Sequence, residues 1–122
     1  MADTARSVLI VDDHAPFRAA ARMLLEGDGF EVVGESEDVA GALADAVRLR
    51  PAIVLLDIGL PDGDGFEVAE RLAERDDSPI VILVSSREVA SYRSRLAESP
   101  ARGFIAKGDL SGDAIAALVD RA

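Results

Sequence analysis

Residues 53–57 read Ile-Val-Leu-Leu-Asp, and this stretch decides the fold. An unbroken run of four β-branched or leucine residues predicts a strand that is buried on both faces. Such strands are typical of a parallel sheet that is covered by helices on both sides. Asp57 ends the run, so its carboxylate is expected at the carboxyl end of a central strand. Ligands of open α/β sheets bind at that edge, outside the carboxyl ends of the strands.

Similar short apolar runs recur on both sides of this stretch and predict further strands. They cover residues 8–11, 30–34, 80–84 and 103–106. Apolar residues at helical spacing lie between and after the runs, at Phe17 to Leu25, Val39 to Val47, Val68 to Leu72, Val89 to Leu96 and Ile115 to Val119. Helix caps and prolines punctuate the expected ends, at Asp38, Ser111, Pro51, Pro79 and Pro100. Five β-α pairs in succession predict a doubly wound α/β sandwich, (βα)5.

Composition and charge limit the classes of function. The 122 residues are 49% hydrophobic and 4% aromatic, which predicts a single domain over residues 1–122 with an aliphatic core and no output domain in this chain. There is no cysteine, which excludes disulfides, thiolate nucleophiles and zinc-thiolate sites. A formal net charge of −10 would repel a phosphate backbone, so we expect no direct nucleic acid binding by this chain. The apolar runs are too short to span a bilayer, so we expect no membrane association and a cytoplasmic location.

Polar side chains follow the ends of four predicted strands. Asp12 and Asp13 follow the first strand, Asp57 the third, Ser85 the fourth and Lys107 the fifth. Three carboxylates at one sheet edge repel one another unless a cation offsets them, which implies a divalent metal. Oxygen ligands favour Mg²⁺, with Mn²⁺ as the alternative, and we expect Asp12 and Asp13 to hold the ion. Asp57 is the natural nucleophile, because carboxylates form acyl phosphates when cations such as Lys107 and donors such as Ser85 neutralise the transferring group.

Each of these residues also has a plainer explanation when it is taken alone. An Asp-Asp pair before a helix is more often a helix cap than a metal site. Asp57 can be a turn residue, Lys107 a solvated loop lysine and Ser85 a helix N-cap. His14, the only histidine, is expected to be a solvated neighbour of the acidic turn and is given no role.

Four motifs stand in order at the ends of the expected strands. They are Val11-Asp12-Asp13, Leu56-Asp57-Ile58-Gly59-Leu60-Pro61-Asp62-Gly63-Asp64-Gly65, Val84-Ser85-Ser86 and Gly103-Phe104-Ile105-Ala106-Lys107. Together they resemble the receiver domains of bacterial two-component response regulators, over essentially the whole chain. The resemblance implies a flavodoxin-like fold with strand order 2-1-3-4-5. It further implies that Asp57 accepts a phosphoryl group from a sensor histidine kinase. The implied metal ligands are Asp12, Asp13, Asp57 and the Gly59 backbone carbonyl, and Ser85 and Lys107 would bind the phosphoryl oxygens.

The same resemblance implies a switch on phosphorylation. The Ser85 hydroxyl would move toward the phosphoryl group, and the Phe104 ring would turn inward behind it. The face formed by the fourth helix, fifth strand and fifth helix would then change, which allows a homodimer linked to phosphorylation. Gly59 and Arg87 would flank the path of the water that removes the phosphoryl group, and only slow self-dephosphorylation is expected.

Two positions depart from the family pattern. Gly108 stands where many receivers have a proline after the lysine, and Phe104 stands where tyrosine is frequent. Residues 11–18 resemble the subfamily whose receivers precede a helix-turn-helix domain. The chain is therefore either a piece of a longer transcriptional regulator, which we favour, or a stand-alone receiver.

Four alternatives share part of the fold or the chemistry. A flavin-binding protein would need small hydroxylic residues to cradle a phosphate where Asp12-Asp13 stands. A magnesium phosphohydrolase would need a second acid two residues beyond the nucleophile, where Gly59 stands. A calcium loop at residues 62–65 would need a ligand in place of Phe66 and a closing glutamate. A degenerate receiver that only mediates contacts would lack a site residue, and none is missing.

Overall fold

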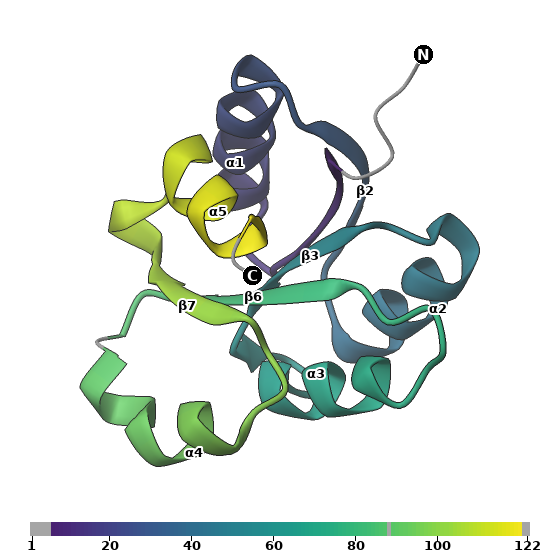
Figure 1. Ribbon diagram of the computed structural model, residues 1–122, viewed down its shortest axis with the longest axis vertical. Coiled ribbons are helices and arrows are strands. Elements are labelled where there is room, and N and C mark those ends of the chain that lie inside the picture. Colours follow the sequence, from purple (N-terminus) through teal and green to yellow (C-terminus); the bar gives the residue numbers. More distant parts are fainter. Residues whose placement is uncertain (1–5, 88, 121–122) are drawn as a thin grey trace.

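The computed structural model describes residues 6–87 and 89–120 and shows a five-stranded parallel sheet between two layers of helices (Figure 1). The strands are β1 (Ser7–Val11), β2 (Glu31–Ser36), β3 (Ile53–Asp57), β6 (Ile80–Ser85) and β7 (Gly103–Ala106). They are arranged in the order β2-β1-β3-β6-β7. Since β6 and β7 are the fourth and fifth strands of this sheet along the chain, the predicted order 2-1-3-4-5 is confirmed.

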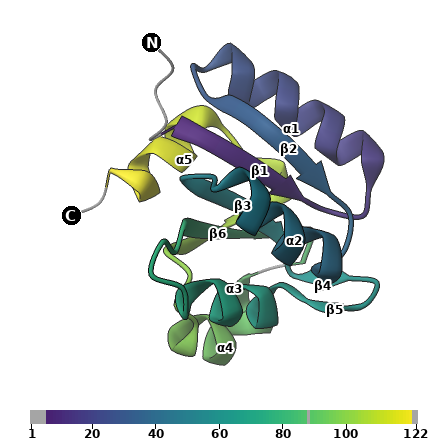
Figure 2. The same ribbon diagram turned by 90° about the vertical axis from the view of Figure 1, so that its right-hand side faces the viewer.

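In the described part of the chain, five α-helices cover the two faces of the sheet. They are α1 (Ala15–Gly27), α2 (Val39–Leu49), α3 (Gly65–Ala73), α4 (Arg93–Glu98) and α5 (Gly112–Val119). Helices α1 and α5 lie on one face, and α2, α3 and α4 lie on the other (Figures 1 and 2). Each face has its own buried cluster of aliphatic side chains. Among the described residues, every helix is too short or too polar to cross a membrane.

Strand β3 is buried along its whole length, as the apolar run predicts. Val54 and Leu56 belong to the cluster on the α2 and α3 side, while Ile53 and Leu55 belong to the cluster on the α1 and α5 side. Burial of each such side chain stabilises the fold by roughly 1.5–3 kcal/mol. The run has no polar break because its alternate residues face two different cores.

Side chains cap the N-termini of α2 and α5. The Asp38 carboxylate accepts a hydrogen bond from the Gly41 N–H at 2.7 Å, and the Ser111 hydroxyl accepts one from the Ala114 N–H at 3.0 Å, which confirms both predicted caps. The Asp62 carboxylate also accepts from the first amides of α2, at 2.7 Å from Val39 and 3.1 Å from Ala40. The loop that follows Asp57 is therefore fastened to α2.

Three features differ from the sequence prediction. Strand β2 runs to Ser36 rather than ending at Gly34, because an edge strand can pair through residues whose side chains are polar. The helix expected over residues 89–96 is divided into a 3₁₀ turn, η2 (Val89–Tyr92), and the short α4. A small hairpin of β4 (Gly59–Leu60) and β5 (Gly63–Asp64) follows β3, and strands of two residues are too short to leave a periodic pattern.

The division of the expected helix falls at Tyr92. Its ring packs between two others, with centroids 5.9 Å from Phe66 and 6.4 Å from Phe104. We attribute the break to this tertiary packing, which the spacing of apolar residues in one segment does not reveal.

Gly65 is where α3 begins, and a larger residue there should destabilise the fold. Its N–H donates to the Ile58 carbonyl at 2.8 Å, and a Cβ at this position would lie 2.5 Å from the Asp57 carbonyl oxygen and 3.0 Å from the Ile58 Cα. Gly65→Ala should therefore cost roughly 1–3 kcal/mol, because backbone atoms must shift to relieve the clash.

Gly59→Ala is the matched control. No atom lies within 4 Å of the position that a Cβ would take at Gly59, so the substitution should change stability by less than about 0.5 kcal/mol. Urea unfolding of both variants measures the difference. Equal stability of the two variants would show that the close approach at Gly65 does not constrain the fold.

Candidate functional site

The candidate site lies where four parallel strands end. Asp57 is the last residue of β3, and its neighbour in the strand register is Val84 of β6. Ser85 ends β6 and pairs with Ala106, after which comes Lys107. Asp12 directly follows β1 on the other side of β3. The sheet therefore brings together the side chains that the sequence predicts at this edge.

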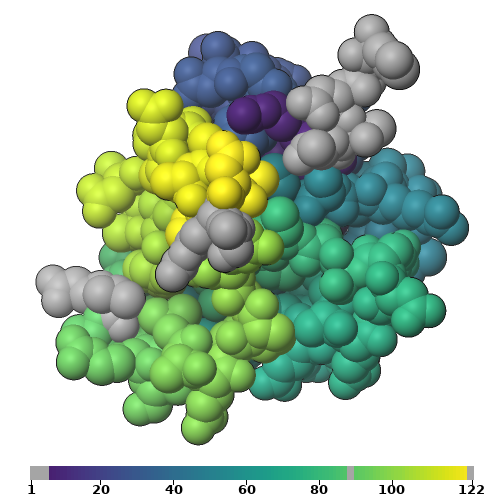
Figure 3. Space-filling view, viewed as in Figure 1, coloured from purple at the N-terminus to yellow at the C-terminus, as the bar shows by residue number. Residues whose placement is uncertain are grey.

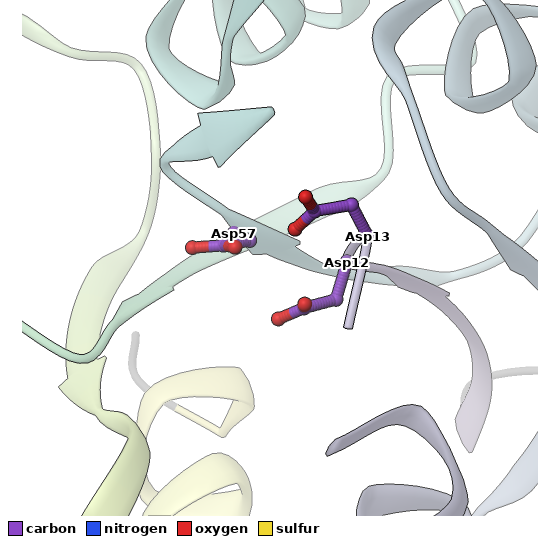
Figure 4. A group of neighbouring side chains, drawn as sticks. All are labelled: Asp12, Asp13 and Asp57. Carbon is purple, nitrogen blue, oxygen red and sulfur yellow. The ribbon is translucent and has the colours of Figure 1, made fainter. Parts of the chain in front are cut away.

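The acidic side chains form one cluster. Asp12, Asp13 and Asp57 each offer a carboxylate oxygen, and these oxygens all lie within 4.8 Å of one another. Figure 4 shows the carboxylates of Asp12 and Asp13 beside that of Asp57 at the strand ends. Asp12 has no exposed surface and Asp57 is 7% exposed, while Asp13 is exposed to solvent. Two buried carboxylates and one exposed carboxylate thus border the same space.

Lys107 is the cation of the cluster. Its Nζ lies 2.6 Å from Asp12 Oδ2 and 3.5 Å from Asp57 Oδ2. Asp12 Oδ2 is buried, and its contact with the Lys107 ammonium is an ion pair. The other Asp12 oxygen accepts from the His14 N–H at 2.8 Å. One oxygen of this buried carboxylate therefore faces a positive charge, and the other accepts from a backbone N–H.

The environment of Asp57 disfavours its charge. Burial, followed by the neighbouring Asp12 carboxylate, raises the pKa of Asp57 from 3.8 to about 6. Lys107 and the Gly59 N–H, which donates to Asp57 Oδ1 at 3.4 Å, oppose this rise in pKa. Burial is thus the main cause of the raised pKa of Asp57, and repulsion from Asp12, which the sequence leads us to expect, adds to it.

Arg18 holds the loop that carries Asp12. Its Nη1 donates to the Asp12 backbone carbonyl at 2.6 Å, and its Nε donates to the Glu35 carboxylate at 3.1 Å. The Asp12 N–H donates to the Ser36 carbonyl at 2.9 Å, so both backbone groups of Asp12 are fixed. Arg18 is not predictable from the sequence as a site residue. Its position in the first turn of α1 gave no signal of this contact, which depends on the tertiary structure.

Ser85 is buried at the edge of the site and touches the 3₁₀ turn η2. Its Oγ accepts from the Arg87 N–H at 3.0 Å and lies 3.5 Å from the Tyr92 hydroxyl oxygen. The Arg87 residue is exposed, and Phe104 is half-buried with its ring against Tyr92. Tyr92 was predicted only as an apolar position of a helix, and its link between Ser85 and Phe104 was not foreseen.

The contacts of Lys107 and Ser85 exclude the plainer explanations that each residue has when it is taken alone. Lys107 is not a solvated loop lysine, because its side chain is 19% exposed and it faces two carboxylates. Ser85 does not cap a helix, since it ends β6 and accepts from the amide of a turn. Where many receivers have a proline, Gly108 lies within a 3₁₀ turn, η3 (Lys107–Asp109).

Comparisons with known proteins agree with this arrangement. The sequence profile of the response regulator receiver domain family matches residues 8–119. BvgA, a regulator of virulence factors from Bordetella pertussis, is 39% identical over 100 residues, which are 82% of this chain and 48% of that protein. The DNA-binding transcriptional activator EvgA from Escherichia coli K12 is 33% identical over 112 residues, which are 92% of this chain and 55% of that protein. The chain spans about half the length of these curated relatives.

Solved structures lead to the same family. The signal receiver domain of NarL from Mycobacterium tuberculosis is similar with a TM-score of 0.81 and 30% identity, and the match covers 95% of this chain and 97% of that one. A LuxR-family response regulator from Staphylococcus aureus shares the fold with a TM-score of 0.82 at 22% identity, and that match covers 94% of this chain and 96% of the other. Since the family profile, the relatives and the sheet all agree, this chain belongs to the response regulator receiver domains, which are signalling domains rather than enzymes.

Proposed function

We propose that Asp57 accepts a phosphoryl group from a sensor histidine kinase and that Mg²⁺ bound beside it supports the transfer. The proposal depends chiefly on one observation, the Asp57 carboxylate lying among two further carboxylates and 3.5 Å from the Lys107 ammonium. Phosphoryl transfer needs such surroundings, because its catalysis is mostly positioning and charge stabilisation. Membership of a signalling family argues against the flavin-binding and phosphohydrolase alternatives.

Asp12, Asp13 and Asp57 would hold the metal ion, with the Gly59 backbone carbonyl as a further ligand. The donor set fits a hard cation, because it consists of oxygens and its three carboxylates lie close together. When bound, Mg²⁺ would offset charge on the phosphoryl oxygens and coordinate one of them. Mn²⁺ shares this preference for oxygen ligands and could take the same place.

The reaction would move the phosphoryl group from a nitrogen to an oxygen. A carboxylate oxygen of Asp57 would bond to phosphorus as the bond from phosphorus to the imidazole nitrogen of a phosphohistidine breaks, with the electron pair returning to the imidazole. The product is an acyl phosphate, so Asp57 must be ionised to form it. The Lys107 ammonium and the Ser85 hydroxyl would bind phosphoryl oxygens. Gly59 and Arg87 would flank the water whose later attack restores Asp57.

The change at Asp57 would reach the surface through Ser85. A Ser85 hydroxyl turned toward the phosphoryl group would leave the Tyr92 hydroxyl, and the Phe104 ring would follow. The surface that would change consists of α4, β7 and α5, which Figure 3 shows as a continuous face from green to yellow. We propose that a homodimer linked to phosphorylation would form through this face.

The names of the relatives support a role in transcription. BvgA and EvgA are regulators of transcription and about twice the length of the matched segment. We therefore propose that this receiver controls a transcription regulator and that contact with DNA belongs to other parts of that protein. A cytoplasmic location would follow, because its kinase partner and DNA would both be met there.

Phosphorylation by a small phosphodonor tests the assignment of Asp57. With Mg²⁺ and acetyl phosphate, the protein should gain one hydroxylamine-labile phosphoryl group, detected by mass spectrometry of the intact chain. Asp57→Asn should abolish the gain because the amide cannot form an acyl phosphate. Asp76→Asn, a change of the same kind at an exposed position in the connection between α3 and β6, should leave it intact. Undiminished labelling of Asp57→Asn would place the acceptor elsewhere.

Thermal unfolding at several pH values tests the crowding of the carboxylates. The folded pKa of Asp57, about 6, exceeds its ordinary value of 3.8. The folded protein therefore binds a proton more readily than the unfolded chain between about pH 4 and 6, and this contribution to stability is lost as the pH rises through that window. Asp57→Asn lacks the charge, so without metal it should have a higher melting temperature than the wild type at pH 8. This difference in melting temperature should shrink toward about pH 4. A constant difference across this range would contradict the raised pKa.

Mg²⁺ should offset the repulsion between the carboxylates and so stabilise the folded protein. At about ten times its dissociation constant the ion should add about 1.4 kcal/mol by preferential binding to the folded chain, which raises the melting temperature by about 3–6 °C. Asp57→Asn should reduce this increment, and NaCl at matched ionic strength should not reproduce it. Protons compete for the same carboxylate, so the affinity for Mg²⁺ should weaken as the pH falls below about 6. If NaCl stabilised the protein as much as Mg²⁺, the cluster would not be a metal site.

The switch can be followed by amide chemical shifts. Beryllofluoride, which mimics a phosphoryl group on a carboxylate, should perturb η2, α4 and β7 more than α2, because Ser85 contacts Tyr92 and Tyr92 contacts Phe104. Tyr92→Phe should weaken the response of α4, since the ring packing remains and the hydroxyl is lost. Changes restricted to the acidic loops would exclude the switch.

A further inference from the structure

The Lys107 ammonium has an aromatic neighbour besides its two carboxylates. Its Nζ lies 4.5 Å from the centroid of the Phe17 ring, over the face of the ring. Phe17 belongs to the first turn of α1, is half-buried and packs against the core cluster between α1, α5 and the sheet. The ring is thus fixed by the core on one side and meets the ammonium on the other.

We propose that Phe17 is a positioning residue, which holds the Lys107 ammonium by a cation–π contact where a phosphoryl oxygen on Asp57 would meet it. The inference rests on the proposed phosphorylation of Asp57. It assigns to Phe17 a role beyond core packing, because the ring would act on the reaction only through the lysine.

The contacts of Lys107 differ in whether they would persist during the proposed reaction. Among the described residues, its ammonium meets Asp12, Asp57 and the Phe17 ring. Both carboxylates are expected metal ligands, and Asp57 would carry the phosphoryl group, so their attraction for the ammonium would fall once the metal ion binds. The attraction of the ring arises from its quadrupole and does not depend on the charge of either carboxylate. Phe17 is therefore the partner that stays the same throughout the proposed reaction.

The flexibility of the Lys107 side chain makes a fixed contact for its ammonium useful. Its side chain is a flexible four-carbon stem whose ordering costs conformational entropy. Gly108 follows it, and no atom lies within 4 Å of the position that a Cβ would take there. A ring that meets the ammonium directly would limit how far the side chain can move toward solvent.

A plain packing role for Phe17 makes different predictions, and Phe30 provides the comparison. Phe30 is 5% exposed, belongs to the same core cluster and has its own cation–π contact, with Arg6 at 4.8 Å. Phe30→Leu therefore removes an aromatic ring from the same layer without touching the lysine. Phe17→Leu keeps an apolar side chain and loses the ring face, whereas Phe17→Tyr and Phe17→Trp keep it.

Lys107 is the only lysine of the sequence, which allows a direct observation of its side chain. In protein labelled with ¹³C in lysine, the Hε resonances should be shifted upfield by the ring current of Phe17. The shift should persist when Mg²⁺ and beryllofluoride are added together. Phe17→Leu should abolish it, and Phe30→Leu should preserve it. A wild-type shift that vanishes with Mg²⁺ and beryllofluoride would overturn the proposal.

Affinity gives the second measurement. With Mg²⁺ at saturation, Phe17→Leu should weaken beryllofluoride binding by roughly 3- to 10-fold, the range expected for loss of a cation–π contact. Phe17→Tyr and Phe17→Trp should stay near the wild type, and so should Phe30→Leu. Equal weakening in Phe17→Leu and Phe30→Leu would show that general packing is responsible, which overturns the proposal. If Phe17→Leu does not fold, Phe17→Met replaces it.

The failure of this inference can be told from failure of the proposed function. If acetyl phosphate labels Asp57 of the wild type and beryllofluoride binds Phe17→Leu as tightly, only the role of Phe17 is wrong. If the wild type neither gains a phosphoryl group nor binds beryllofluoride, the proposed function itself is wrong, and the role of Phe17 is wrong with it.

Discussion

The compensation of the buried Asp12 carboxylate is the constraint on which the rest of the site depends. An ionised carboxylate without exposed surface is costly unless a charge or hydrogen bonds offset it. Lys107 supplies one positive charge, but it faces Asp57 as well, and Asp13 is close by. One lysine against three carboxylates leaves two negative charges, which is the charge that a divalent cation would balance. Without such an ion, burial and then the repulsion from Asp12 raise the pKa of Asp57, so that protonation of Asp57 relieves part of the charge.

The two aliphatic cores make this crowding tolerable. The residues of β1 and β3 are buried along both strands, so the backbones that end in Asp12 and Asp57 cannot easily move apart. Arg18 adds a further constraint, since it holds the Asp12 carbonyl from α1. Functional sites commonly oppose the stability of the fold that carries them, and the surrounding packing offsets the cost. Here the destabilising contribution is electrostatic repulsion, and the stabilising contribution is apolar packing. A change of pH or an added metal ion alters mainly the first, so the two contributions can be measured separately.

The sequence predicted those features that depend on local pattern. The run at residues 53–56 marked the central strand, and the position of each polar residue after an apolar run placed Asp12, Asp57, Ser85 and Lys107 at one edge. The order of the strands followed from resemblance to a family, not from any periodicity. The contacts of Phe17 and Arg18 could not be predicted from the sequence, because they join the start of α1 to groups that only the folded sheet brings near. The hairpin of β4 and β5 could not be predicted for another reason, because each strand has too few residues to show a period.

Weak packing distinguishes α4, the helix on which the proposed switch would act. No described residue of α4 is buried, and the helix is only six residues long. The partly buried Leu96 packs against the core, and the Tyr92 ring packs at the start of the helix. Arg95 adds a surface contact, since its guanidinium pairs with Asp64 at 2.9 Å and lies 4.2 Å from the centre of the Phe66 ring. Segments with few buried contacts open at low free energy, so small changes in their anchors shift them. The Tyr92 hydroxyl is one such anchor, and its neighbour is the Ser85 oxygen. A group that redirects Ser85 would therefore act on the least firmly held helix, while the sheet beneath it stays in place.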